Sequence, residues 1–188
     1  MIPLPINSRR PLDLKLLDTI DLRPREQFAG SAWRVVRADR DPLQGSPAGG
    51  RWDPGTFDVL YTSLDQNGAM AEMNFHLSRL PLFPSKMRWL LHRLTVNAKC
   101  TLKFADFSSL EALKVCSDRY PDVLYPHTQA IGDAARHLGF DSLIAPSARW
   151  ECLNLVLFTD HLDPGNVIVE SAEEISWDDW HHSSGLLK

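Results

Sequence analysis

Short hydrophobic runs separated by polar residues dominate the chain, and their spacing predicts more strands than helices. Runs rich in β-branched and aromatic residues predict strands over residues 33–38, 58–63, 87–96, 143–145, 152–158 and 166–169. Hydrophobic steps of three and four predict helices over residues 65–80, 108–116 and 128–138. Several predicted strands follow one another too closely for crossover helices, so we expect partly antiparallel pairing. The predicted fold class is α+β, with a mixed or split sheet and flanking helices.

The helix after the second predicted strand has two distinct faces. Asp65 or Asn67 can cap its N-terminus, because either side chain can accept a backbone N–H. One face is a hydrophobic stripe that we expect to be buried, formed by Met70, Met73, Leu77 and Leu80. The polar residues of the other face are Glu72, His76 and Arg79. One helical turn separates Glu72 from His76, a spacing that suits either acid–base chemistry or an ordinary surface pair.

The later helices carry their own end signals. Ser108 and Glu111 have the spacing of a capping box, which predicts a helix from there through Cys116. Gly139 follows the helix over residues 128–138 and is expected to end it as a C-terminal cap. The polar residues from 178 to the C-terminus are predicted to form a loose tail.

The length of 188 residues, with 44% hydrophobic residues, fits one domain with a sizeable core. We expect this domain over residues 31–170, preceded by an N-terminal extension over residues 1–30 and followed by a C-terminal tail over residues 171–188. The extension carries prolines and charges, and a short hydrophobic stretch over residues 14–20 predicts a helix or turn that packs on the domain.

Charge and cysteine content exclude several classes of protein. The formal net charge is −4 and no run of Lys or Arg stands out, which argues against a direct nucleic-acid partner. The chain shows neither the apolar core of a signal peptide nor a run of membrane-spanning length, so we expect a cytoplasmic protein without a membrane partner. Cys100, Cys116 and Cys152 are too widely spaced to predict a disulfide framework or a zinc site.

Familiar catalytic motifs are missing from the sequence. Ser147 lacks the G-x-S-x-G context of a nucleophile elbow, and no phosphate-binding glycine fingerprint is present. His181 and His182 follow two aspartates, but a polar tail of this kind is more often solvated than metal-bound, so no metal is predicted. The residues alone therefore indicate an α+β domain with an Arg-bearing, Gly-rich loop at residues 49–54.

Five segments between residues 30 and 160 together resemble the RES family, which is named for an Arg, a Glu and a Ser. They are Trp33-Arg34, Gly49–Pro54 (GGRWDP), Val59–Ser63 (VLYTS), Ala69–Glu72 (AMAE) and Pro146–Arg149 (PSAR). Asp53 stands where the family commonly has Asn. We expect little effect of this difference, because a short polar residue there can still turn the loop.

The resemblance implies an ADP-ribosyltransferase-like fold and a bacterial toxin that uses NAD⁺ as its substrate without a metal. Family members pair with a helix-turn-helix antitoxin of the Xre type. Some cleave NAD⁺ with water or phosphate, and others ADP-ribosylate a protein, phosphoribosyl pyrophosphate synthetase. We therefore expect cleavage of the nicotinamide–ribose bond, with the acceptor left open among protein, phosphate and water. The alternative is a non-catalytic module that binds NAD⁺ or the antitoxin.

The resemblance also assigns roles to individual residues. Glu72, Arg34 and Arg51 are the predicted catalytic residues. Glu72 would stabilise the cationic ribose, and the two arginines would hold the pyrophosphate, with Arg37 as a competing choice. Tyr61 would place its ring near the nicotinamide, unless it is a core tyrosine. Ser147 would hydrogen-bond the ligand or orient Glu72. Two further residues have weaker assignments. Trp52 would anchor the loop, and His127 would either line the pocket or lie on the surface.

Overall fold

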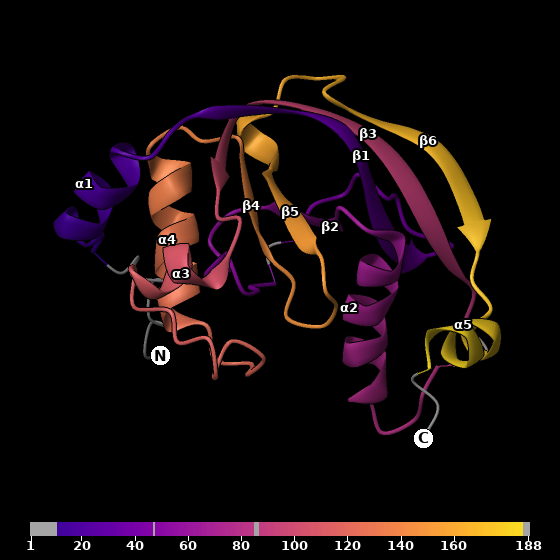
Figure 1. The fold of residues 1–188 in the computed structure, drawn as a ribbon. Helices are drawn as coiled ribbons and strands as arrows, with labels where there is room; N and C mark the ends of the chain where they lie inside the picture. The colour runs from indigo at the N-terminus through magenta and orange to yellow at the C-terminus, as the bar shows by residue number, and fades with distance from the viewer. Residues whose placement is uncertain (1–10, 47, 85–86, 186–188) are drawn as a thin grey trace, which may run out of the picture.

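The computed structural model describes residues 11–46, 48–84 and 87–185. A six-stranded sheet forms the centre of the molecule, and its strands pair in the order β1-β2-β5-β4-β3-β6, with a further pairing of β1 to β3 (Figure 1). The strands are β1 Glu26–Arg37, β2 Val59–Ser63, β3 Trp89–Lys103, β4 Ser142–Pro146, β5 Leu153–Phe158 and β6 Val167–Glu174. Because β3 pairs with β1 as well as with β4, five strands form a closed ring of pairs, to which β6 is added.

The long strand β3 divides the sheet. Its first half, Leu90 to Val96, pairs antiparallel with β6, whereas Thr101 to Lys103 pair parallel with β4. Along its other edge β3 pairs antiparallel with β1 over nearly the whole length of that strand. The predicted α+β class with a mixed, split sheet is confirmed.

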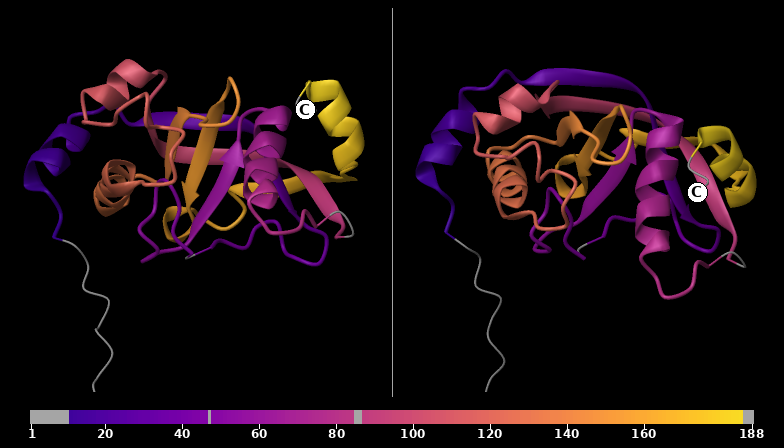
Figure 2. Two further views of the ribbon diagram at one scale, coloured as in Figure 1. Left: turned by 90° about the horizontal axis from the view of Figure 1, so that it is seen from below. Right: turned by 60° about the horizontal axis from the view of Figure 1, so that its bottom comes forward.

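Helices cover both ends of the sheet (Figures 1 and 2). They are α1 Leu14–Asp21, α2 Gln66–Ser78, α3 Phe107–Glu111, α4 Pro126–His137 and α5 Trp177–Ser184, with a 3₁₀ turn at Thr159–His161. Helix α1 packs on α4 at one end, and α2 packs on β1 and β2. In every view α5 lies beside α2, the helix that bears Glu72.

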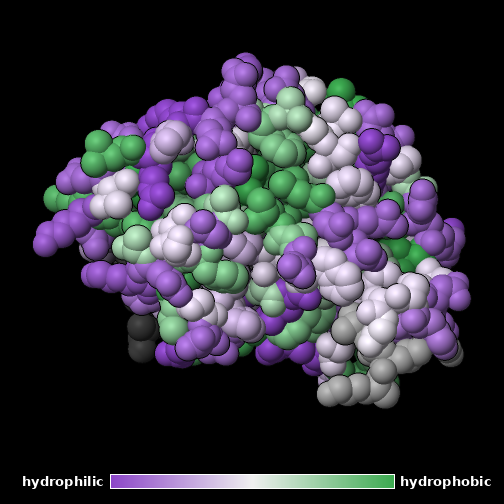
Figure 3. Space-filling view, in the orientation of Figure 1, coloured by the Kyte–Doolittle hydropathy of each residue, from purple (hydrophilic) through white to green (hydrophobic). Residues whose placement is uncertain are grey.

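Buried hydrophobic residues form three clusters, one for each set of packed elements. The largest lies between α1, α3, α4 and the sheet and contains Trp52, Phe104 and Phe140. A second fills the interior of the strand ring, and a third joins α2 and α5 to β1 and β3. Figure 3 shows hydrophobic residues reaching the surface over β4 and β5, with polar residues around them.

The strands are where the sequence predicts them, but β1, β3 and β6 extend several residues further and β4 gains one residue at each end. Strand β1 begins at Glu26 rather than Trp33, and β3 continues to Lys103 rather than Val96. Strand β6 continues to Glu174 although its side chains are exposed. The small residues at the start of β1 have weak strand propensity, and pairing with β3 decides their conformation. The domain boundaries at residues 30 and 170 stay a prediction.

Two helix predictions need correction. The predicted capping box of Ser108 and Glu111 is wrong: Asp106 is the N-cap of α3, and its carboxylate accepts the Ser109 N–H at 3.0 Å. The helix also ends at Glu111 instead of Cys116, and Lys114 then adopts a left-handed conformation with φ 66°.

Helix α2 largely matches its prediction. Asp65 is its N-cap, and Met70 and Leu77 are buried while Met73 is partly buried. Leu80, the last residue of the expected stripe, is 49% exposed because the helix ends at Ser78. Helix α4 also matches, with Gly139 in a left-handed conformation just after it.

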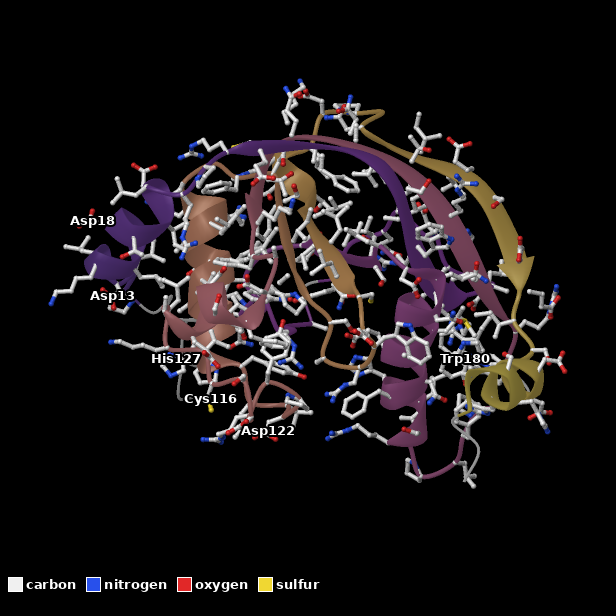
Figure 4. All side chains as sticks on the ribbon, viewed as in Figure 1. Asp13, Asp18, Cys116, Asp122, His127 and Trp180 are labelled. Carbon is white, nitrogen blue, oxygen red and sulfur yellow. The ribbon has the colours of Figure 1, made fainter. Side chains whose placement is uncertain are left out.

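The prediction of a loose C-terminal tail is wrong for the described residues, because residues 177–184 form α5. Trp177 and Trp180 are buried against α2, and Trp180 Nε1 donates to Asn67 Oδ1 at 3.1 Å. Figure 4 shows Trp180 between the two helices. Residues 186–188 of the predicted tail lie outside the described residues. No helix in the described part is long and apolar enough to cross a membrane.

Candidate active site

A pocket of about 290 Å³ opens where the loop before β2 meets β1, β2 and α2. Arg34 of β1, Arg51 of the loop, Tyr61 of β2 and Glu72 of α2 all line it. Residues distant in sequence complete the wall: Phe75, His76, Tyr125, Arg149 and Asn154. The structure thus brings four of the five sequence-predicted site residues to one pocket.

The Gly-rich loop is held rigidly beneath this pocket. Trp52 is buried and stacks on Phe104 with ring centroids 6.3 Å apart, so it acts as the loop anchor. Tyr61 Oη donates to Asp53 Oδ2 at 2.7 Å and accepts the Trp52 N–H at 2.9 Å. Gly50 must lack a side chain, because a Cβ there would lie 2.6 Å from Tyr61 Oη. The loop conformation therefore depends on Tyr61 and Asp53 together.

Tyr61 and Asp53 are perturbed by their burial. Burial and the neighbouring Asp53 charge raise the pKa of Tyr61 well above 10, so its hydroxyl stays protonated. Burial also raises the pKa of Asp53, although hydrogen bonds from Tyr61 and from loop N–H groups oppose that shift. Tyr61 thus has a structural hydrogen-bonding role in addition to lining the pocket.

Glu72 is oriented by two side chains that are distant from it in sequence. Ser147 Oγ donates to Glu72 Oε1 at 2.8 Å, and Asn154 Nδ2 donates to the same oxygen at 3.0 Å. Ser147 is buried and is not among the pocket-lining residues. No described side chain hydrogen-bonds Oε2. One carboxylate oxygen is therefore fixed by the protein, and the other remains available to a ligand.

Arg34 lines the pocket, and the hydrogen-bond donors of its guanidinium group are only partly paired. Its Nη2 donates to the Gln44 carbonyl at 3.1 Å, whereas its buried Nη1 has no partner among the described residues. Burial lowers the pKa of Arg34 to about 10, so the group is still charged at neutral pH. A buried guanidinium donor without a partner favours an anionic ligand. Arg37, the competing choice, instead forms an exposed ion pair with Asp39.

The Arg51 side chain is hydrogen-bonded to the segment before α4. Its Nη1 donates to the Tyr120 carbonyl, and its Nη2 lies 3.5 Å from the Asp122 carbonyl. The guanidinium carbon also lies 4.4 Å from the centroid of the Tyr120 ring and 4.7 Å from that of Tyr125. Arg51 lines the pocket and also anchors this loop, so its loss would affect both.

His76 follows Glu72 by one turn of α2 and lines the same pocket. Partial burial lowers the pKa of His76; the Glu72 charge raises it, and the charges of Arg149, Arg79 and Arg51 lower it further. The net shift is downward, which favours the neutral form of the imidazole.

A family model described as "RES domain" matches residues 31–178, most of the chain. The chain belongs to the RES domain family. The NAD(+) phosphorylases MbcT of Mycobacterium bovis and Mycobacterium tuberculosis are each 24% identical to this RES domain protein over 172 residues, covering 88% of this chain and 92% of the relative. A chain in the crystal structure of the M. tuberculosis MbcT–MbcA toxin–antitoxin complex matches this fold with a TM-score of 0.82 at 23% identity, covering 92% of this chain and 98% of that chain.

Three pocket residues of this RES domain received no role from sequence reasoning. Arg149 lies within a segment of the family resemblance, but nothing in its local pattern indicates that it reaches the pocket. Asn154 is in β5 directly opposite Ser63 of β2, and only the strand pairing reveals its position beside Glu72. Phe75 would be taken for an ordinary helix residue.

The histidines considered in the sequence lie outside the pocket, apart from His76. His127 is exposed at the start of α4 (Figure 4) and is not among the pocket-lining residues. His181 Nε2 lies 2.8 Å from Asn74 Oδ1, which places it in the contact between α5 and α2. Within the described ranges, no group of three His, Cys, Asp or Glu residues is arranged to hold a metal ion.

Proposed function

We propose that this protein is the toxin of a toxin–antitoxin pair and that it cleaves NAD⁺ with inorganic phosphate as the acceptor. The products would be nicotinamide and ADP-ribose 1-phosphate. The observation that carries the proposal is Glu72, whose Oε1 is fixed by Ser147 and Asn154 while Oε2 is left to a ligand in the pocket.

The chemistry of NAD⁺ explains why such a carboxylate would be effective. Nicotinamide leaves as a neutral molecule and needs little acid catalysis, so the main barrier is the cationic character of the ribose. A carboxylate beside that carbon, or on the ribose 2-hydroxyl, stabilises the transition state by several kcal/mol in glycoside cleavage. Fixing one oxygen of Glu72 in advance reduces the reorganisation that this stabilisation would otherwise cost.

The surrounding residues suit the rest of the substrate. Arg34, with its unpartnered donor, would bind the pyrophosphate together with Arg51. Tyr61 would present part of its ring to the nicotinamide, while its hydroxyl stays bonded to the loop. Ser147 would act through Glu72 rather than on the ligand, because it hydrogen-bonds that carboxylate and does not line the pocket.

The acceptor and the partner are proposed from the relatives. MbcT is named an NAD(+) phosphorylase, which favours phosphate over water or a protein as the acceptor. The matched structure is a toxin–antitoxin complex, which supports an antitoxin partner for this chain. We propose that this antitoxin is of the helix-turn-helix, Xre type, and that an acidic or carboxylate-ended segment of it blocks the Arg-lined pocket.

One assay tests the proposed reaction. The purified protein is incubated with NAD⁺ labelled in the adenylate moiety, with and without phosphate and with a cell lysate. We expect nicotinamide release that depends on phosphate and yields labelled ADP-ribose 1-phosphate. Free ADP-ribose alone would indicate hydrolysis, and label on a protein would indicate protein ADP-ribosylation. No turnover under any condition would favour the non-catalytic binding module.

The matched variants are Glu72→Gln in the pocket and Glu170→Gln on the exposed strand β6. Glu72→Gln removes the negative charge but keeps the shape, so we expect a loss of turnover with NAD⁺ binding retained. Glu170→Gln should behave as the wild type. Equal activity of all three proteins would refute the role of Glu72.

A further inference from the structure

We propose that Arg149 and Arg79 form a separate subsite for the phosphate acceptor beside Glu72. This inference rests on the proposed phosphorolysis. Both guanidinium groups contact the ring of Phe75, with the Arg149 carbon 3.3 Å and the Arg79 carbon 5.4 Å from the ring centroid. Phe75 itself lines the pocket three residues after Glu72 in α2. The ring thus places Arg149, which lines the pocket, near Arg79, which does not line the pocket itself.

These two charges are not compensated by ion pairs. Other arginines on the surface, such as Arg88 and Arg136, pair with carboxylates, but no carboxylate of the described residues lies within ion-pair distance of Arg149 or Arg79. Two neighbouring cations that share an aromatic ring and lack an acidic partner make a favourable place for a multiply charged anion.

The hydrogen bonds of Arg149 leave donors unused. Its Nη2 donates to the Pro121 carbonyl at 2.7 Å, and its buried Nε has no partner among the described residues. No described residue hydrogen-bonds its Nη1, which is not among the buried polar atoms. The contact with Pro121 fixes the direction of the guanidinium, and Nη1 remains open to an incoming oxygen. Burial lowers the pKa of Arg149, and the nearby Glu72 charge opposes that shift.

The position of Arg149 favours the acceptor over the pyrophosphate of NAD⁺. Its backbone N–H donates to Ser147 Oγ at 3.1 Å, and that hydroxyl donates to Glu72 Oε1. Arg149 is therefore linked through Ser147 to the carboxylate that would face the reacting carbon, and the Glu72 charge acts on its guanidinium. An acceptor must reach that carbon, whereas the pyrophosphate is separated from it by the ribose ring and the 5-carbon. Arg34, on β1, is the more suitable partner of the pyrophosphate.

Electrostatics give a reason for two arginines at this place. A phosphate dianion that approaches Glu72 meets a like charge, and neighbouring cations are needed to offset that repulsion. Water needs no such help, so the pair would favour phosphate as the acceptor. Arg79 is exposed just after α2, where phosphate can enter from solvent. Figure 4 shows the loop with Asp122, which follows Pro121, on the same side of the molecule as this end of α2.

The reaction at this subsite balances without another reagent. One oxygen of HPO₄²⁻ forms a bond to the ribose carbon as the carbon–nitrogen bond to nicotinamide breaks. The electron pair of that bond leaves with nicotinamide and neutralises its ring nitrogen. The phosphate keeps its proton, and the product is ADP-ribose 1-phosphate.

The test compares Arg79→Gln, Arg149→Met and the control Arg40→Gln, an exposed arginine in the loop after β1. Initial rates of nicotinamide release are measured with phosphate varied at saturating NAD⁺, and with NAD⁺ varied at saturating phosphate. We expect the KM for phosphate to rise about 5-fold in Arg79→Gln and about 10- to 100-fold in Arg149→Met, as for lost charge-assisted hydrogen bonds. The KM for NAD⁺ should change less than about 2-fold, and Arg40→Gln should match the wild type.

The outcomes separate this inference from the proposed function. Phosphate-dependent turnover in the wild type with an unchanged KM for phosphate in the variants overturns the subsite alone. A rise in the KM for NAD⁺ instead assigns the arginines to the pyrophosphate and also overturns it. Wild-type turnover that is independent of phosphate overturns the proposed function and the subsite together. Arg79 makes no side-chain hydrogen bond among the described residues, so its variant keeps the test valid even if Arg149→Met folds poorly.

Discussion

Replacing Ser147 by Ala should slow the chemical step of NAD⁺ cleavage without weakening substrate binding. The variant removes the 2.8 Å hydrogen bond from Ser147 Oγ to Glu72 Oε1 and leaves that of Asn154 at 3.0 Å. Because Ser147 is outside the pocket lining, we expect the ligand to lose no direct contact. The carboxylate gains freedom to rotate away from the ribose, and turnover falls.

The hydrogen bond sets the size of the effect. A hydrogen bond to a charged group contributes about 1.5–3 kcal/mol, which corresponds to about 10- to 150-fold in rate. Since Asn154 still holds the same oxygen, we expect the lower end, a decrease in kcat of about 10-fold. The double variant Ser147→Ala/Asn154→Ala should lower kcat by more than the product of the two single decreases, because each residue partly substitutes for the other.

The assay measures kcat and KM for NAD⁺ in Ser147→Ala, in the double variant and in Ser171→Ala, a control on the exposed strand β6. A thermal melt of each protein tests for loss of folding, because Ser147 also accepts the Arg149 N–H. Ser147→Thr, which keeps a hydroxyl, should recover part of kcat. The positioning role of Ser147 would be refuted if Ser147→Ala kept the wild-type kcat while Glu72→Gln was inactive.

Three further predictions concern stability. Gly132→Ala should destabilise the protein by about 1–3 kcal/mol or more in urea unfolding, because the new Cβ would lie 1.8 Å from the Trp52 carbonyl oxygen; an unchanged midpoint contradicts this. Asp53→Asn should match the stability of the wild type below about pH 4 and be the more stable protein at neutral pH. The reason is that the pKa of Asp53 is raised in the folded state, so ionisation of Asp53 costs stability as pH rises. A difference in melting temperature between the two proteins that stays constant from pH 4 to 8 would contradict this. Trp180→Ala should cost about 3–5 kcal/mol and speed hydrogen exchange in α2, which unchanged protection would contradict.

The local pattern of the sequence was enough to predict most of the elements. Runs rich in β-branched and aromatic residues located all six strands, and steps of three and four located α2 and α4. Asp65 was predicted as one of two caps of α2, and Glu72 and His76 were predicted on one polar face. These features depend on residues within one or two turns of each other. The resemblance to the RES family rested on the order of five short segments, and the family match over residues 31–178 confirms that family.

Contacts between distant residues decided the rest. The extent of β1 follows from its pairing with β3, and α5 forms because Trp177 and Trp180 are buried against α2. A polar local sequence such as that after Asp178 cannot reveal this burial, because the hydrophobic surface that receives the tryptophans belongs to another part of the chain.

The candidate active site shows the same division. The sequence by itself determined that Glu72 lies on a polar helix face and that Arg51 lies in a Gly-rich loop. Only the tertiary structure decided that Ser147, 75 residues away, and Asn154, 82 residues away, donate to Glu72. It also decided that Arg149 reaches the ring of Phe75. Hydrogen bonds and cation–π contacts act over a few ångströms of space, and folding alone sets which distant residues come that close.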